Sequence, residues 1–276
     1  MPLLNVPVGE AKQGETAPRR NFKVKDAAVV RPIGWKCSTL YEYFNESVEK
    51  QGKTRKCQGW RDLIDVHTET KKITKVIEGK EVTVDKNWLY YEKSDYKYIS
   101  FGDLQTLVNH YGKGLLQIGI NHTETDKLHL FASTSPHWMR TFLACQTQGI
   151  PVVTAYDSLG EDGLIHSLVQ TGSKVIFTDN DLLTKLVNPL KKATEVKFII
   201  HSEDINPDDK RADGSLYRNA VTAIDQIKES RPDIKFYSLN EVISLGKEND
   251  STQNVHPPKP ESLACIMYTS GSTGPP

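Results

Sequence analysis

Short apolar segments alternate with segments of helical periodicity from about Ser100 to Ile200, and this alternation constrains the fold most. Apolar runs typical of buried strands lie at 127–131, 151–154, 174–177 and 196–200. Apolar residues recur at helical spacing at 104–118, 136–147, 161–171 and 181–193. Strands that alternate with helices of this length pair in parallel. The sequence therefore predicts an α/β fold with a doubly wound, mostly parallel sheet.

The chain before this region has a different character. Residues 1–36 show little periodicity, and we expect an irregular N-terminal extension. It carries seven Lys or Arg and three acidic residues, so it is either a basic arm that touches an anionic membrane or an extension wrapped on the domain. A helix is predicted at 38–50, a hairpin around 73–77 that turns at 78–80, and a strand at 96–99.

The C-terminal third predicts fewer elements. A polar loop at 203–216 leads to a helix at 219–230. A proline-rich connection at 249–260 then delivers the chain to a strand at 263–268. We therefore expect residues 37–276 to form a single, incomplete α/β domain.

Composition excludes several classes of protein. With 35 basic and 35 acidic residues, the chain lacks the basic excess typical of nucleic-acid binding, so we expect no nucleic-acid partner. The four cysteines include no CxxC pair, which argues against a zinc site and favours free thiols in a reducing compartment. Cys145 and Cys265 lie among apolar residues and are expected in the core. No apolar run is long enough to span a membrane, and residues 1–8 do not resemble a secretory signal.

The last nine residues, 268–276, form a loop of hydroxyl residues and glycines directly after an apolar strand. A flexible linker is one interpretation, but linkers seldom follow a buried strand. A Walker P-loop is a second, but Gly271 and Gly274 are too close together and no Lys-Ser or Lys-Thr follows. The third is the loop of adenylate-forming enzymes, in which glycines admit the polyphosphate and hydroxyls donate to it. Residues 268–276 match that pattern, and its lysine would be the next residue.

Beyond this loop, the chain resembles the long-chain fatty-acid–CoA ligases, above all the fungal ones, of the adenylate-forming superfamily. The resemblance covers nearly the whole chain and is strongest at residues 15–20, 59–62, 127–130, 149–157, 163–174 and 256–258. It implies that a fatty carboxylate attacks the α-phosphorus of ATP and that CoA then attacks the acyl-adenylate. It therefore implies ATP, Mg²⁺ and CoA as cofactors, a long-chain fatty acid as partner, and peripheral association with the endoplasmic reticulum or lipid droplets from the cytoplasm.

By this resemblance the phosphate-binding residues lie in the terminal loop. Backbone donors, hydroxyls and Mg²⁺ would neutralise pyrophosphate as it leaves. The predicted set is Thr269, Ser270, Gly271, Ser272, Thr273 and Gly274. An ordinary turn at the end of a strand is the alternative for the same residues. No catalytic residue and no metal ligand is assigned.

Other polar residues are expected to be structural. His129 lies within an apolar strand and is predicted to be a hydrogen-bonded core histidine. His137 and Trp138 lie at a strand-to-helix corner and are assigned to packing. Asp157 is predicted to cap the next helix, with a role in substrate binding as the alternative. His166 is expected on the surface or in the core of that helix rather than as a base.

Family members are longer, so the resemblance implies that parts of the enzyme are absent here. These parts are the loop lysine, the motif that helps to bind adenine and Mg²⁺, the ribose-binding aspartate, the acyl tunnel and the C-terminal domain. We therefore expect the 276-residue polypeptide to be inactive alone and prone to aggregate at its last strand. A non-catalytic protein that keeps the ligase framework, and an adenylate-forming ligase for a different acid, remain alternatives.

Overall fold

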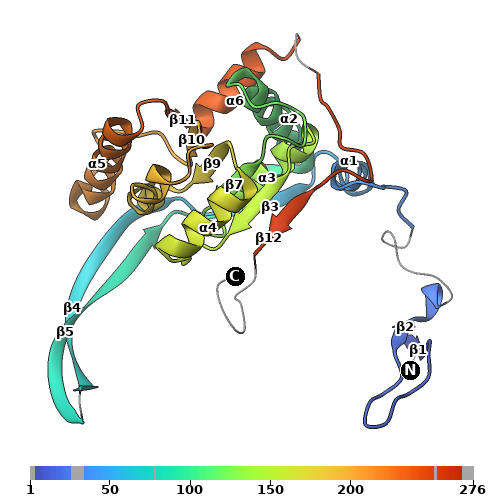
Figure 1. Ribbon diagram of the computed structural model, residues 1–276, viewed down its shortest axis with the longest axis horizontal. Coiled ribbons are helices and arrows are strands. Elements are labelled where there is room, and N and C mark those ends of the chain that lie inside the picture. Colours follow the sequence, from blue (N-terminus) through green and yellow to red (C-terminus); the bar gives the residue numbers. More distant parts are fainter. Residues whose placement is uncertain (1–3, 26–33, 78, 252–253, 269–276) are drawn as a thin grey trace.

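The computed structural model describes residues 4–25, 34–77, 79–251 and 254–268 (Figure 1). Its centre is a six-stranded sheet in which all neighbouring strands are parallel, in the order β11-β10-β9-β7-β8-β12. The strands are β7 (Leu128–Phe131), β8 (Val152–Ala155), β9 (Val175–Thr178), β10 (Phe198–His201), β11 (Lys235–Ser238) and β12 (Cys265–Met267). The parallel sheet predicted from the sequence is confirmed.

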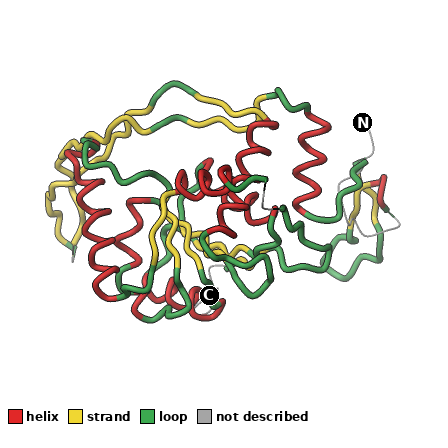
Figure 2. Tube along the Cα trace, turned by 90° about the horizontal axis from the view of Figure 1, so that it is seen from above, coloured by secondary structure: helices red, strands yellow, loops and turns green. Residues whose placement is uncertain are grey.

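Helices cover both faces of this sheet, as Figures 1 and 2 show. Residues of α2 (Phe101–Gln117), α3 (Pro136–Thr147) and α6 (Leu239–Glu248) share one apolar cluster with Leu128 and Leu130 of β7. Residues of α4 (Glu161–Thr171), α5 (Ser215–Ser230) and the 3-10 helix η2 (Asn180–Leu186) share the other with Phe131. Alternate residues of a strand therefore serve opposite faces, which makes the sheet doubly wound.

Local signals explain where several helices begin. Thr39 caps α1 (Leu40–Gln51) by accepting a hydrogen bond from the Glu42 amide, and Ser100 caps α2 in the same way. Ser238 and Glu241 form a reciprocal capping box at the start of α6. The predicted helices at 38–50, 104–118, 136–147 and 161–171 are therefore present, with ends shifted by a few residues.

The predicted helix at 181–193 is wrong in type. The structure has two 3-10 helices here, η2 and η3 (Pro189–Lys191). Pro189 lacks an amide hydrogen, and its ring would clash with the carbonyl four residues earlier, so an α-helix cannot run through it. Strand β11 and helix α6 were not predicted, because β11 holds only two apolar residues between Lys235 and Ser238.

A long hairpin projects from the body of the protein (Figure 1). Its strands β4 (Leu63–Ile77) and β5 (Lys80–Lys93) are antiparallel and much longer than the predicted strand at 73–77. At its base, β3 (Lys56–Trp60) pairs with β6 (Lys97–Ser100), close to the predicted strand at 96–99. The N-terminal segment contains a small hairpin of β1 (Asn5–Pro7) and β2 (Arg19–Asn21), followed by η1 (Phe22–Val24).

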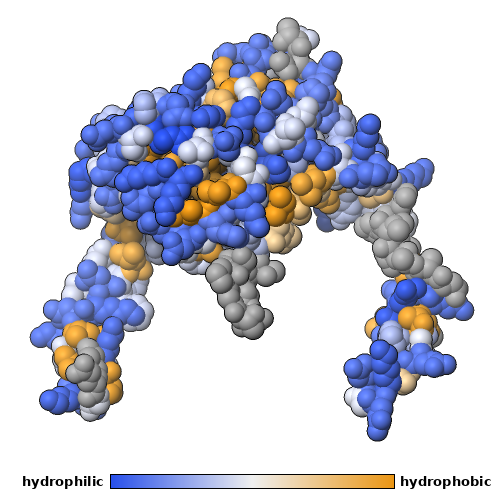
Figure 3. Space-filling view, in the orientation of Figure 1, coloured by the Kyte–Doolittle hydropathy of each residue, from blue (hydrophilic) through white to orange (hydrophobic). Residues whose placement is uncertain are grey.

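Strand β12 forms one edge of the large sheet. In the described residues its single partner is β8, and Met267 is 72% exposed. Figure 3 shows apolar surface over α4 and around β12. An exposed apolar edge can pair with other chains, so the expected tendency to aggregate stays a prediction. None of the helices within the described ranges has the length and apolar character that crossing a membrane requires.

Candidate functional site

The predicted phosphate loop starts at the carboxyl edge of the sheet. Its residues Thr269 to Gly274 lie outside the described residues, but Tyr268, which precedes them, is described. The Tyr268 hydroxyl donates to Oε1 of Gln170 at 2.5 Å, and its ring meets the edge of His166, with ring centroids 6.1 Å apart. Both partners belong to α4, so this helix fixes the point from which the loop departs. His166 was predicted on the surface or in the core of this helix, and the structure places it on the exposed surface of α4.

The carboxyl ends of three neighbouring strands meet beside this point. After β7, the Ser133 amide donates to Oδ2 of Asp179 at 2.7 Å, and the Ser133 hydroxyl donates to Oδ2 of Asp157 at 2.8 Å. Asp157 follows β8 and Asp179 follows β9. Open parallel sheets bind ligands outside the carboxyl ends of their strands, where the strand order reverses. Here the chain passes from β8 across β7 to β9, so the reversal lies among these residues.

Asp157 does not cap α4, and that prediction is wrong. Gly160 occupies the N-cap position without a side-chain hydrogen bond, because the turn places Asp157 three residues further back. The Asp157 carboxylate accepts from Ser133 instead, and its carbonyl accepts from the Lys185 ammonium at 2.7 Å. Asp157 therefore ties the ends of β7 and β8 together and connects them to η2.

Burial changes the proton affinity of the acids at this edge. Desolvation raises the pKa of Asp179 above its usual value, although the Ser133 amide opposes the change. Desolvation likewise raises the pKa of Asp181. These carboxylates still accept hydrogen bonds from neighbouring groups. The network of Ser133, Asp157 and Asp179 therefore fixes the strand ends.

His129 is a core histidine, as predicted. It is fully buried in β7, and its Nε2 lies 2.9 Å from the Ser167 hydroxyl of α4. Its Nδ1 has no hydrogen-bond partner among the described groups. Burial lowers the pKa of His129 to about 3, so the ring is neutral at pH 7. Trp138 packs as expected, stacked on Phe142 with ring centroids 5.7 Å apart.

A large cavity that the sequence did not predict lies near the carboxyl ends of β9 and β10. Its volume is about 1130 Å³, and residues from the base of the hairpin, from β3 and from the first turns of α3 line it. Two lining residues are unusual: Arg140 is buried, and the Nδ1 atom of His137 is buried without a partner. Its charge alone would place Arg140 on the surface of the protein. A charged residue within an otherwise apolar helix face was the available signal.

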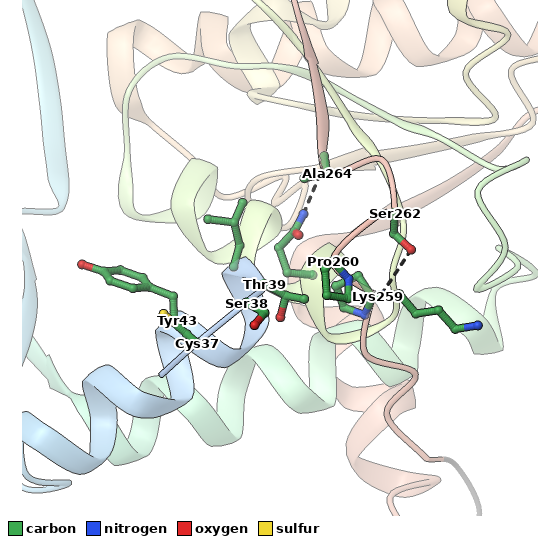
Figure 4. Close-up of a pocket in the computed structure, with 11 residues that line it drawn as sticks. Cys37, Ser38, Thr39, Tyr43, Lys259, Pro260, Ser262 and Ala264 are labelled. Atoms are coloured by element: carbon green, nitrogen blue, oxygen red, sulfur yellow. Dashed lines mark hydrogen bonds between the residues drawn. The ribbon is translucent and has the colours of Figure 1, made fainter. Parts of the chain in front are cut away.

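A smaller cavity of about 410 Å³ lies at the opposite edge of the sheet (Figure 4). It is formed by the start of α1, including Tyr43, and by the segment that leads into β12. There the Gln146 amide group donates to the Ala264 carbonyl, and the Ser262 hydroxyl accepts from the Lys259 amide. Because Ala264 precedes β12 and the loop follows it, this cavity is separated from the candidate site by the length of the strand.

The described residues offer no site for a metal ion. Across the described ranges, no group of three or more His, Cys, Asp or Glu side chains is arranged to bind one. All four cysteines are free thiols. Cys145 is fully buried, which raises the pKa of its thiol, whereas Cys265 is only half-buried at the sheet edge. The expected core position is thus confirmed for Cys145 and only in part for Cys265.

Comparison with protein families and curated proteins gives consistent results. A family model described as "AMP-binding enzyme" matches residues 78–276. Long-chain-fatty-acid–CoA ligase 1 of Saccharomyces cerevisiae is 52% identical over 98% of this chain, and ligase 4 of the same yeast is 54% identical over 99%. Ligase 1 of Schizosaccharomyces pombe is 37% identical over 97%. The chain spans 39% of each of the two Saccharomyces cerevisiae proteins and 36% of the other.

Solved structures with a similar fold are adenylation domains. The adenylation domain of a carboxylate reductase from Mycobacterium chelonae aligns with a TM-score of 0.64 and 19% identity, over 89% of this chain and 34% of that one. A carboxylic acid reductase didomain from Segniliparus rugosus, in complex with AMP, aligns with a TM-score of 0.60 and 18% identity, over 90% and 32%. At this level of identity the likeness establishes the fold alone.

Proposed function

Because this chain belongs to the AMP-binding enzyme family, we propose that it is part of a ligase that converts long-chain fatty acids into acyl-CoA with ATP. The observation that carries the proposal is the identity of 50–54% to three ligases of Saccharomyces cerevisiae over nearly the whole chain. In the first step a carboxylate oxygen bonds to the α-phosphorus of ATP, and pyrophosphate leaves. In the second, the CoA sulfur bonds to the acyl carbon, and AMP leaves.

In this reaction the chain would bind the leaving pyrophosphate. The hydroxyls of Thr269, Ser270, Ser272 and Thr273 would donate to phosphate oxygens, and Gly271 and Gly274 would let the backbone approach. The contact of Tyr268 with Gln170 supports this role, because it anchors the start of the loop on α4. Mg²⁺ usually takes several of its ligands from substrate phosphates and water, so the lack of a protein cage among the described residues suits it.

The test uses the product of the complete gene with ATP, CoA and saturated acids of increasing length. We expect palmitoyl-CoA, AMP and pyrophosphate in equal amounts. We also expect Thr269→Ala and Ser272→Ala each to lower kcat by about ten- to a hundredfold, because each removes one donor to the developing charge. Ser262→Ala is the matched control, since this serine precedes β12 and bonds to the Lys259 amide. A preference for short or aromatic acids would contradict the proposed substrate, and an inactive product would contradict the reaction.

We also propose that the protein acts at the cytoplasmic face of a membrane, where long-chain acids partition. The support is the excess of basic residues in 1–36, which would attract anionic lipids. Co-sedimentation with vesicles that contain phosphatidylserine should fall when Lys12, Arg20 and Lys25 are changed to Gln, and should fall with added salt. Equal binding to neutral vesicles would contradict an electrostatic attachment.

A further inference from the structure

The segment between α6 and β12 carries the strand from which the phosphate loop departs (Figure 1). The structure describes it at residues 249–251 and 254–264, and we call it the connection. These residues form neither helix nor strand, so separate contacts must hold them against the body of the protein. Strand β12 has only three residues and, in the described part of the chain, a single partner strand, β8. The position of β12 therefore depends on how the connection is held.

His256 is the residue at which the connection is fixed to the end of α3. Its amide donates to the Thr147 carbonyl at 2.9 Å and to Oε1 of Gln148 at 3.2 Å. Its carbonyl oxygen passes so close to Gly149 that a Cβ on this glycine would lie 3.3 Å from it. The backbone of His256 is therefore held closely by α3, while its ring contacts a different segment.

The His256 ring stacks on the ring of His122. The ring centroids are 3.8 Å apart, and the planes are inclined by 7°. His122 belongs to the loop between α2 and β7, where the Asp126 carboxylate accepts from the Asn121 amide at 2.8 Å and from the Lys174 ammonium at 2.7 Å. Neither ring makes a hydrogen bond within the described ranges, so the two flat faces form the whole side-chain contact.

No carboxylate of the described residues forms an ion pair with either ring. The titratable and charged residues on the neighbouring segments are Glu124 and Asp126 of the loop, Lys174 before β9, His110 and Lys113 of α2, and Asp250 and Lys259 of the connection. Asp126 is paired with Lys174, and Asp250 is paired with Lys113 at 2.6 Å. Burial, followed by the charge of His122, lowers the pKa of His256, and no acid in the described structure opposes this change.

Two protonated imidazoles at this separation repel each other. One proton on the pair is tolerated, because a cation over the face of a neutral aromatic ring is attracted to it. A second proton places two like charges 3.8 Å apart. We propose that the His122–His256 pair is an acid-sensitive contact, and that protonation of both rings releases the connection, and with it the start of β12, from the body of the protein. This local release does not depend on the proposed function, although an effect on ATP binding would rest on it.

The direction of the pH dependence follows from the change in proton affinity. The pKa of His256 is lowered in the folded protein from its ordinary value of 6.5, so the released state binds the proton more tightly. The contact is therefore fully present above about pH 6.5 and weakens below it, by at most about tenfold per pH unit for each proton taken up. At the other end of the connection, His110 lies 3.7 Å from Asp250, and a proton on His110 would strengthen that contact. Release should therefore be confined to the part of the connection next to β12.

Hydrogen exchange of the product of the complete gene, corrected for the intrinsic exchange rate at each pH, tests the proposal. We expect the protection of peptides that cover 254–264 to fall about three- to tenfold between about pH 6.5 and pH 5.5. In His122→Phe a flat ring can still stack on His256 but cannot take up a proton, and the replaced residue is exposed. Protection at neutral pH should then stay within about twofold of the parent, and the loss in acid should disappear. His110→Gln is the matched control and should keep that loss.

Local release can be distinguished from global unfolding in the same experiment. Peptides from β9 and β10 should keep their protection over this pH range. An equal loss of protection in β9 and β10 would show that acid acts through global unfolding, and it would overturn the proposal. So would constant protection of the connection in the parent protein, or an undiminished loss in His122→Phe. The measurement uses neither ATP nor a fatty acid, so its outcome is independent of whether the protein is a ligase.

Discussion

The parallel sheet and the β4–β5 hairpin are both built of hydrogen-bonded strands, but they differ in how deeply their side chains are buried. All residues of β9 and β10 are buried. In β5, by contrast, every residue is exposed except Val84, which is half-buried. An isolated two-stranded hairpin is marginally stable in water, since net stability comes mainly from apolar burial. From this difference in burial we expect the sheet to unfold as one cooperative unit, and the hairpin to open locally at a much lower free energy of opening.

The largest expected effect is in the sheet core. Phe177→Ala removes a fully buried ring from β9, and we expect the free energy of unfolding to fall by about 3–5 kcal/mol. Its counterpart in the hairpin is Trp88→Ala, at a residue that is 43% exposed, where we expect a change below about 1 kcal/mol. Urea denaturation followed by circular dichroism measures both. Equal losses would show that the hairpin and the sheet form one stability unit.

The next effect concerns glycines. A Cβ on Gly114 of α2 would lie 1.9 Å from the Val242 carbonyl oxygen of α6, which rules out Gly114→Ala without separation of the two helices. We expect a loss of about 1–3 kcal/mol, typical of an overpacked core. In the hairpin turn, Gly79 has a φ of +78° with nothing near its missing Cβ, so Gly79→Ala strains only the turn.

Thermal melting of the two variants separates these positions. The melting temperature should fall for Gly114→Ala and remain nearly unchanged for Gly79→Ala. If Gly79→Ala were the more damaging change, the hairpin turn would have to be coupled to the core, against the contrast drawn above.

A further effect depends on pH and has opposite signs in the two regions. The pKa of His129 is about 3 in the folded protein because of burial, against an ordinary value of 6.5. Between these values the unfolded chain alone binds the proton, so the free energy of unfolding falls by about 1.4 kcal/mol per pH unit as the pH drops from 6.5 towards 3. In His129→Gln this slope should be weaker.

The hairpin histidine, His67, provides the control. Its hydrogen bond to Glu92 raises the pKa of His67, so any stability from this pair is present below pH 6.5 and is lost as the pH rises through the folded-state value. Because the pair is exposed, His67→Gln should leave the acid slope almost unchanged. A similar slope in the parent chain and in His129→Gln would show that other groups carry the acid sensitivity.

The contrast also explains what could be predicted from the sequence. Buried parallel strands such as β9 are continuous apolar runs, and the helices between them begin at recognisable caps, so this part was predicted. The cavity was not, because Arg140 meets Gln58, which lies 82 positions earlier, and no local pattern records that contact. The phosphate loop was proposed from its motif and family resemblance, but the contact of Tyr268 with Gln170, 98 positions away, required the structure.

The change that we expect to affect global stability least lies at the base of the hairpin, where β4 contacts the body of the protein. The Asp65 carboxylate accepts from the Ala212 amide at 3.0 Å and thereby joins β4 to η4 (Arg211–Gly214), and this contact lowers the pKa of Asp65. Asp65→Ala should leave the melting temperature of the sheet nearly unchanged but speed proteolytic cleavage within 63–93, because cleavage follows local opening. Asp85→Ala, at an exposed position of β5, is the control and should not change the cleavage rate. If Asp65→Ala lowered the melting temperature as much as Phe177→Ala, the hairpin would be part of the cooperative core.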